Sequence, residues 1–324
     1  MRDTRIGLIG TGMMGSAIAR RLLASGYTLI VYNRSRWKAE ALKGYGAMVA
    51  ETPMDVAKQV ELLITVVKDE HALEDVLFSS NGVVYAKHYR EGGKKGYDRD
   101  GSGSDDGDGS GDGWLTLADV STINPFASKA IASRLNEHGI IMLDTPVMGG
   151  PQLAEQGNLV MMVGGSREHF ERFIDVFNRM AGRIFYIGCN GSAHTMKLAL
   201  NLQIAMIAAA LSEGILLVER SGLDPMLFLE ILNSTYFKTG MSERKGPRMV
   251  KGEYEKSFAL EMMLKDVKTI NDAARALDIS LPMASMLEQC YRLASKTELA
   301  DKDYTALLEF LRIANRDRMM KKQS

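Results

Sequence analysis

The decapeptide IGLIGTGMMG, residues 6–15, constrains the fold of this chain more than any other segment. A short apolar run passes through Gly10, Gly12 and Gly15 directly into a helical pattern. In a strand–turn–helix of this kind the first glycine permits a tight turn, the second lets the backbone approach a pyrophosphate, and the third lets the helix pack on the strand. The pyrophosphate would lie at the helix N-terminus. The segment therefore predicts a dinucleotide site, and a purely structural glycine turn is the alternative.

The pattern around this turn predicts the fold class. Five apolar runs predict buried strands: TRIGLIG, TLIVYN, ELLITVV, LTLADVST and IIMLDTPV. Amphipathic stretches such as GSAIARRLLASG and SRWKAEALKGYG separate the first of them, which indicates a parallel sheet with helices on both faces. After RIFYIG only helical patterns follow, at 193–220, 224–235, 258–276, 281–296 and 303–318. We therefore predict an α/β chain with a doubly wound Rossmann-type domain over 1–190 and an all-helical domain over 191–324.

Residues 92–113 fit neither domain, because they consist almost entirely of Gly, Asp and Ser. Such a composition cannot offset its ordering entropy, so we predict a disordered surface loop. A calcium loop is the alternative, with ligands at Asp98, Asp100, Ser102, Gly103 and Asp106. Position 12 of that template requires a bidentate Glu, and here it is Gly109. We expect no specific metal site in this segment.

Composition restricts the class of partner. The 324 residues carry 40 basic and 40 acidic side chains, so no overall basic field favours nucleic acid or an anionic membrane. Two cysteines suggest a reducing compartment, and the five histidines lack metal-ligand spacing. The N-terminus shows no signal-peptide core. In the apolar helical pattern at 193–220, the uncharged run extends only over residues 198–212, which is shorter than the roughly 18–20 residues that a bilayer needs. We expect a cytoplasmic protein.

The end of the second predicted strand bears on the choice of dinucleotide. NAD sites usually have an acid there, roughly 20 residues after the glycines, bound to the ribose 2′-hydroxyl. This chain has Asn33, followed by Arg34 and Ser35. Arg34 can bind a 2′-phosphate bidentately and Ser35 can donate a hydrogen bond, so the pattern favours NADP over NAD. Alternatively, Ser35 only caps the next helix and the arginine is solvated.

The apolar helix starts with two polar residues that a buried helix does not need, Lys197 and Asn201. Ser192 is the expected N-cap. The helix dipole and the apolar neighbours would both lower the pKa of Lys197, toward a range suited to proton exchange. Asn201 lies one turn further on the same face. A lysine that extends to solvent at the helix end is the alternative.

Five segments resemble, in order and spacing, those of the β-hydroxyacid dehydrogenase family. This family includes 3-hydroxyisobutyrate dehydrogenases, tartronate semialdehyde reductases and glyoxylate/succinic semialdehyde reductases, and 6-phosphogluconate dehydrogenase is a larger relative. The five segments are IGLIGTGMMGSAIARRLLASGY, DVSTINP, LDTPVMGGPQLAEQGNL, VMMVGG and GCNGSAHTMKLALN. The segment FALEMMLKDVKTINDAARALDISLP is similar to the family's C-terminal Lys-Asp segment. The resemblance extends over nearly the whole chain apart from 92–113.

The resemblance implies an NADP-dependent oxidoreductase that interconverts a small β-hydroxyacid and its semialdehyde or ketoacid by hydride transfer, with reduction favoured. Lys197 would be the general acid/base and Asn201 would orient the substrate oxygen. Ser121, Gly149 and Gly150 would bind the substrate carboxylate. The residues expected at the cofactor are Gly10, Thr11, Gly12, Met13, Met14, Gly15, Asn33, Arg34, Ser35, Val67, Thr122 and Lys265.

The chain departs from the family pattern near the expected site. Met148 replaces a serine before the two glycines, and Lys68 occupies a position where proline is common. An imine reductase-like enzyme is one alternative, although such enzymes generally lack a lysine equivalent to Lys197. A non-catalytic dinucleotide-binding module is another. If Lys197 is not the proton donor, His194 or Lys265 would be. We expect a homodimer or homotetramer that binds neither nucleic acid nor membrane.

Overall fold

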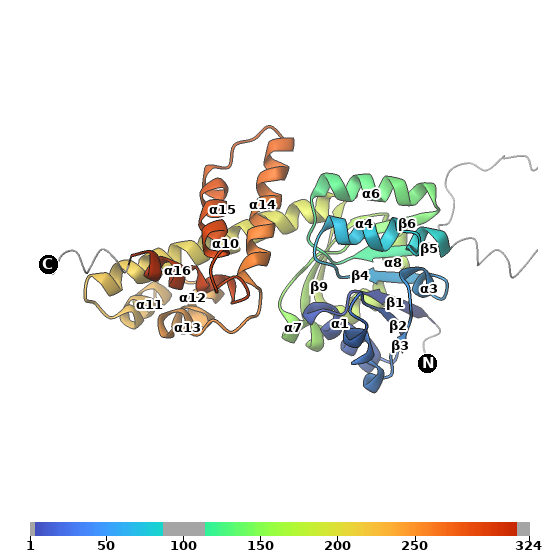
Figure 1. Cartoon of the computed structure of the whole chain (residues 1–324), viewed down its shortest axis with the longest axis horizontal. Helices are drawn as coiled ribbons and strands as arrows, with labels where there is room; N and C mark the ends of the chain where they lie inside the picture. The colour runs from blue at the N-terminus through green and yellow to red at the C-terminus, as the bar shows by residue number, and fades with distance from the viewer. Residues whose placement is uncertain (1–3, 87–113, 316–324) are drawn as a thin grey trace, which may run out of the picture. The chain divides into compact units, whose positions relative to one another are not determined.

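The computed structural model describes residues 4–86 and 114–315 (Figure 1). The calcium-loop template, from Asp98 to Gly109, lies outside the described residues, as does the end of the last predicted helix. The chain divides into two compact units, Met1–Lys197 and Leu198–Ser324. This division falls inside one long helix. The domain boundary predicted from the sequence, at 190/191, instead lies between the end of the last strand and the start of that helix. Each unit is described by itself.

Unit 1 is built on a nine-stranded sheet. Its first six strands are parallel and lie in the order β3-β2-β1-β4-β5-β6. This is the strand order of a Rossmann fold. The sheet continues through β8, which is antiparallel to β6 and β7 and parallel to β9. The strands are β1 (Arg5–Ile9), β2 (Thr28–Tyr32), β3 (Met48–Val49), β4 (Leu62–Thr65), β5 (Leu115–Asp119), β6 (Ile140–Asp144), β7 (Val147–Met148), β8 (Leu159–Gly165) and β9 (Ala181–Gly188).

Helices cover both faces of this sheet (Figure 1). One core joins β1 to α1 (Met13–Ala24), α7 (Pro151–Gln156), α8 (Arg167–Arg172) and α9 (Ile174–Met180). The other core joins the opposite face to α3 (Pro53–Ala57), α4 (Glu70–Phe78), η2 (Val83–Ala86) and α6 (Pro125–Glu137). Ile6 and Leu8 belong to the first core and Ile9 to the second, as the two-residue repeat of a strand requires.

The structure confirms all five predicted strands and corrects two other expectations. The sheet is mixed, because β8 runs antiparallel to β6. The helix expected over 35–46 is only α2 (Arg36–Glu40), followed by the 3-10 turn η1 (Lys43–Tyr45). Gly46, with φ of 96°, ends that turn in the left-handed region.

Unit 2 contains helices only within the part that the structure describes. The helix α10 (Ser192–Arg220) enters it from unit 1 and contributes Ala205 and Ala208 to its main core. By length and composition α10 could cross a membrane, contrary to the expectation from its uncharged run; 33% of its most apolar window is buried, and buried residues of α10 belong to the cores of unit 2. The others are α11 (Pro225–Asn233), α12 (Gly240–Arg244), α13 (Gly246–Lys251), α14 (Leu260–Ala276), α15 (Pro282–Ala294), η4 (Tyr304–Ala306) and α16 (Leu307–Ala314). The sequence did not predict α12 and α13.

Candidate active site

The glycine turn between β1 and α1 has the geometry that its sequence predicts. Gly10 has φ of 98°, and a Cβ there would overlap the carbonyl oxygen of Val66. A Cβ at Gly15 would overlap the carbonyl oxygen of Gly10, so only glycine lets α1 approach the strand this closely. A Cβ at Gly12 would have no atom within 4 Å. The turn therefore leaves open space where a pyrophosphate can approach the first amides of α1.

A groove of about 700 Å³ follows the carboxyl ends of β1, β2 and β4. It lies where the strand order reverses between β1 and β4, which is where doubly wound sheets bind their ligands. Six of the predicted cofactor residues line it: Gly10, Gly12, Asn33, Arg34, Ser35 and Val67. Thr11, Met13, Met14, Gly15 and Thr122 are not among its lining residues, and Lys265 lies on α14 in unit 2.

Asn33 has a structural role at this groove. Its Oδ1 accepts a hydrogen bond of 3.0 Å from the Thr11 amide, and its Nδ2 donates one of 3.0 Å to the Ser35 carbonyl. An aspartate could accept the first bond but could not donate the second. The absence of an acid at this position is therefore explained partly by the backbone of unit 1. The sequence interpretation, which assigned it to the cofactor alone, was incomplete.

The cations near Asn33 differ in their availability. Arg34 is exposed, lines the groove and has no hydrogen-bond or ion-pair partner among residues 4–86 and 114–315. Arg36 is bound to Glu40 at 3.0 Å and also to Glu51. Ser35 occupies the N-cap position of α2, as the alternative proposed, but its side chain makes no capping hydrogen bond there.

Two further lysines line the groove, Lys38 and Lys68. The sequence analysis missed Lys38, although its position four residues after Arg34 was a usable signal. Lys68 was noted only as a departure from the family pattern. Together with Arg34 they bring three cations to the groove, whose lining also includes the carboxylates of Glu51, Asp69 and Asp75.

The start of α10 is fixed by a residue distant in sequence. Asp144, at the end of β6, accepts hydrogen bonds from the Gly191 amide, from Ser128 Oγ at 2.7 Å and from Asn190 Nδ2 at 3.2 Å. A carboxylate in this position complements the positive end of the helix dipole. Ser192 is the first helical residue and donates its hydroxyl to the Cys189 carbonyl, so the predicted N-cap role is wrong.

Lys197 is half-buried beyond the first turn of α10. Its Nζ donates to the Met148 Sδ at 3.1 Å. Met148 ends β7 and directly precedes Gly149, which has φ of 125°, and Gly150, which occupies the N-cap position of α7. Within unit 1, the predicted proton donor thus lies beside the glycine pair predicted to bind a carboxylate. A thioether is a weak acceptor, so this contact restrains the ammonium only weakly.

Ser121 follows β5 and is nearly fully buried. Its hydroxyl donates to Asp119 Oδ1 at 2.7 Å and accepts from the Val67 amide at 2.9 Å. Thr65 Oγ1 donates to the same Asp119 oxygen at 2.7 Å. Burial raises the pKa of Asp119, and His194 and these hydroxyl donors oppose the shift. Because the hydroxyl hydrogen of Ser121 is already used, its contact with a substrate carboxylate stays a prediction.

The predicted residues of unit 2 form a buried chain. Asn201 Nδ2 donates to Asp266 Oδ2 at 2.6 Å, and Lys265 Nζ lies 2.9 Å from Asp266 Oδ1. Asn201 and Asp266 are 3% and 1% exposed. Asp266 therefore fixes the orientation of the Asn201 amide, a role that the sequence analysis did not assign.

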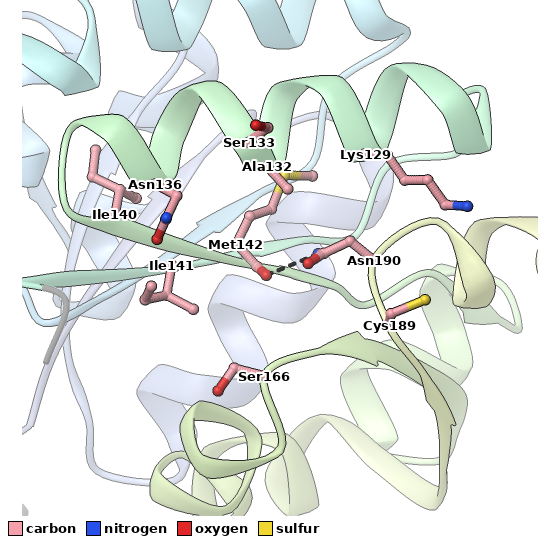
Figure 2. A pocket seen from close by; sticks show the side chains of 10 residues that line it. All are labelled: Lys129, Ala132, Ser133, Asn136, Ile140, Ile141, Met142, Ser166, Cys189 and Asn190. Carbon is pink, nitrogen blue, oxygen red and sulfur yellow. Dashed lines mark hydrogen bonds between the residues drawn. The ribbon is translucent and has the colours of Figure 1, made fainter. Parts of the chain in front are cut away.

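A second cavity in unit 1, of about 560 Å³, contains none of the predicted site residues. It lies between α6 and β6, and its rim includes Cys189 and Asn190 (Figure 2). Figure 2 shows the Asn190 amide directed at the Met142 carbonyl, to which it donates at 2.9 Å. This cavity therefore borders the segment that leads into α10.

Comparison with known families accounts for both units. A family model described as the NAD-binding domain of 6-phosphogluconate dehydrogenase matches residues 5–93 and 112–188. A second, described as NAD-binding of NADP-dependent 3-hydroxyisobutyrate dehydrogenase, matches 191–311. The chain belongs to the β-hydroxyacid dehydrogenase family. This dehydrogenase uses a nicotinamide dinucleotide, and the first model passes over 94–111, which are thus an insertion relative to the family.

Relatives of the dehydrogenase are similar over almost its full length. Glyoxylate/succinic semialdehyde reductase 2 of Arabidopsis thaliana is 29% identical over 95% of this chain and 80% of its own. Mitochondrial 3-hydroxyisobutyrate dehydrogenase of Rattus norvegicus is 29% identical over 95% of this chain and 87% of its own. The solved structure of 3-hydroxyisobutyrate dehydrogenase from Salmonella typhimurium covers 95% of this chain and 100% of its own, with 25% identity and a TM-score of 0.78. The dehydrogenase is therefore an NAD(P)-dependent enzyme of the hydroxyacid dehydrogenase and semialdehyde reductase class.

Proposed function

We propose that this dehydrogenase is an NADPH-dependent reductase of a small semialdehyde or ketoacid, with Lys197 as the proton donor. The observation that supports this most is the contact of 3.1 Å between Lys197 Nζ and Met148 Sδ. It holds an ammonium group next to Gly149 and Gly150, whose amides suit the carboxylate of such a substrate.

The bound cofactor supplies the hydride that reduces the substrate carbonyl. Lys197 donates a proton from Nζ to the carbonyl oxygen as negative charge develops there, and it takes the alcohol proton in the reverse direction. The thioether is a weak acceptor, which a substrate oxygen can replace as the partner of the ammonium. Asn201, whose amide is oriented by Asp266, is expected to orient the substrate oxygen.

Three residues support NADP rather than NAD as the preferred cofactor. Arg34 is exposed in the groove without a protein partner among the described residues, and Ser35 and Lys38 lie beside it. These side chains can bind the 2′-phosphate of NADP, because a guanidinium binds phosphate bidentately and the lysine ammonium adds a second positive charge. Asn33 introduces no negative charge that would repel the phosphate.

The substrate that fits these residues is a short carboxylic acid with a carbonyl group. The Gly149 and Gly150 amides would bind its carboxylate, and the Met148 thioether would give the pocket an apolar wall. A relative is named for glyoxylate and succinic semialdehyde, which are both short acids of this kind. We place the substrate of this enzyme in the same chemical class.

We further propose that the enzyme acts in the cytoplasm as a homodimer or homotetramer. Unit 2 exposes several large apolar side chains, Leu217, Leu223, Leu227, Ile231 and Phe237. Exposed large apolar side chains in such number are expected where subunits associate. Light scattering during size-exclusion chromatography would report the mass, and a monomer at micromolar concentration would contradict the proposal.

A panel of carbonyl compounds, followed by NADPH absorbance, tests the proposed reaction. We expect turnover of short aldehyde acids such as glyoxylate and succinic semialdehyde, and much weaker turnover of matched aldehydes that lack the carboxylate. Turnover of cyclic imines without turnover of the acids would instead indicate an imine reductase. Binding of NADPH without turnover of any compound would indicate a non-catalytic module.

A further inference from the structure

A histidine and two aspartates form a buried cluster beneath the start of α10. Asp119 and Asp144 end the neighbouring strands β5 and β6 and are register partners in the sheet. His194 lies on α10 between them, with Nε2 3.8 Å from Asp119 Oδ2 and 3.9 Å from Asp144 Oδ1. All three residues are 0% exposed. Among the residues that the structure describes, these two carboxylates are the ionisable groups paired with His194.

The two aspartates differ in how their oxygens are satisfied. Both Asp144 oxygens accept hydrogen bonds, from Ser128, Asn190 and the Gly191 amide. Asp119 Oδ1 accepts from Thr65 and Ser121, whereas its Oδ2 has no hydrogen-bond partner. Both ring nitrogens of His194 are unsatisfied as well. Buried polar atoms are rarely left in this condition, so these three atoms require a partner, and Asp119 Oδ2 and His194 Nε2 are each near an unsatisfied atom of the other residue.

The nearest atoms of the two side chains face each other beyond hydrogen-bond distance. Nε2 and Oδ2 are 3.8 Å apart, so a bond between them requires one or both side chains to rotate. Two ionised carboxylates on adjacent strands, both removed from water, would repel each other strongly. Asp144 accepts hydrogen bonds on both oxygens, whereas Asp119 Oδ2 accepts none, so Asp119 is the carboxyl group with an oxygen available to share a proton.

We propose that Asp119 and His194 form a buried hydrogen-bonded pair that shares one proton, and that His194 is thereby a positioning residue for the reaction. The pair ties the first turn of α10 to the carboxyl edge of the sheet. Lys197 follows His194 by three residues on the same helix, so the pair fixes the position of Lys197 along the axis of α10 and the direction in which its side chain leaves the helix. Asp119 also holds the Ser121 hydroxyl, and this connects the pair to the predicted carboxylate site. The positioning role rests on the proposed function of Lys197, whereas the shared proton does not.

Proton NMR of the intact wild-type enzyme tests the shared proton directly. We expect one slowly exchanging, strongly downfield ring proton that disappears in His194→Gln and shifts upfield in Asp119→Asn. The asparagine keeps an oxygen for Thr65 and Ser121 and turns an amide NH₂ toward His194, but it cannot share a proton. If a folded wild-type enzyme shows no such proton, or if the proton is unchanged in Asp119→Asn, the proposal is wrong.

Kinetics of His194→Gln test the positioning role. We expect kcat to fall by about tenfold to a hundredfold, the scale of a misplaced catalytic group, with the KM for NADPH unchanged. His169→Gln is the matched control, because His169 is also buried in unit 1 but hydrogen-bonds to Thr116 at 2.7 Å outside the cluster. It should lower the melting temperature and leave kcat unchanged.

The two experiments separate the possible failures. A wild-type kcat in folded His194→Gln, or an equal loss in His169→Gln, would overturn the positioning role. The downfield proton is independent of Lys197. If Lys197→Ala stays fully active while the proton is present, the proposed function fails and the Asp119–His194 pair stands.

Discussion

Removal of the Arg34 side chain should change the cofactor preference of the enzyme. Arg34 is exposed in the groove and has no partner among the described residues, so Arg34→Ala breaks no hydrogen bond or ion pair of the protein itself. A bidentate guanidinium–phosphate contact comprises two charge-assisted hydrogen bonds, each about 1.5–3 kcal/mol. Because the site is open to solvent, we take a combined loss of about 2 kcal/mol, which corresponds to a roughly 30-fold weaker interaction.

The assay compares kcat/KM for NADPH and NADH at a saturating concentration of the acid semialdehyde. The value for NADPH should fall roughly 30-fold in Arg34→Ala, and the value for NADH should stay the same. Arg36→Ala is unsuitable as a control, since it releases Glu51, which lines the groove, from its ion pair. Arg183→Ala is better, because Arg183 is exposed but does not line the groove. An equal loss for both cofactors, or none for either, would refute the 2′-phosphate assignment.

Three other changes test separate parts of the structure. Met148→Ser should remove the Sδ contact with Lys197, because a serine oxygen lies one bond closer to the backbone than Sδ. It should also replace an apolar wall with a hydroxyl, so kcat/KM should rise for substrates hydroxylated next to the carbonyl relative to unsubstituted ones, as measured over a substrate panel. Replacing 94–111, over which the family model passes, with a short Gly-Ser linker should leave kcat and melting temperature nearly unchanged. Burial alone would raise the pKa of Asp303, but Lys245 at 2.7 Å and hydroxyl donors hold that pKa below its usual range. The Asp303 carboxylate therefore stabilises the fold at pH values above its unfolded-state pKa, and this stabilisation is lost as pH falls through its folded-state pKa. Asp303→Asn should lower the free energy of unfolding by about 3 kcal/mol at neutral pH. Denaturant titrations at a series of pH values should also show a smaller loss of stability toward acid pH in the variant.

Most of the fold could be predicted from local patterns. The five predicted strands are continuous apolar runs, and the spacing of the glycines at 10, 12 and 15 between a strand and a helix is typical of a dinucleotide-binding turn. The strand β8 was not among the five predicted strands, and its direction could not be predicted, because VMMVGG is apolar throughout and carries no signal for parallel or antiparallel pairing. The short helices α12 and α13 were missed because they begin with Gly240 and with Gly246 followed by proline, which are usually signals for turns.

The candidate site was predictable in its residue types but not in its contacts. The sequence singled out Lys197, Asn201 and Met148. It could not show that Asp144, 47 residues before Gly191, accepts the hydrogen bond that starts α10, so Ser192 was taken as the cap. Tertiary hydrogen bonds of this kind leave no periodic pattern in the sequence.

The same limit applies to the polar pairs around the site. Asn33 was interpreted only as a missing acid, although its amide joins the glycine turn to the segment after β2. His194 was considered only as a substitute proton donor, and its burial against Asp119 and Asp144 became visible only in the folded chain. These roles depend on which strands are neighbours, and therefore on the sheet order.

The turnover of Lys197→Ala tests the central claim most directly. General acid catalysis contributes roughly 10²–10⁴-fold, so kcat should fall by about that factor on a substrate that the parent enzyme reduces well. Lys197→Arg keeps a positive charge but releases its proton far less readily, and it should be impaired as well. The dissociation constant of NADPH should be unchanged in both variants, because none of the groove-lining residues is altered. A folded Lys197→Ala variant with near-wild-type kcat would contradict the account.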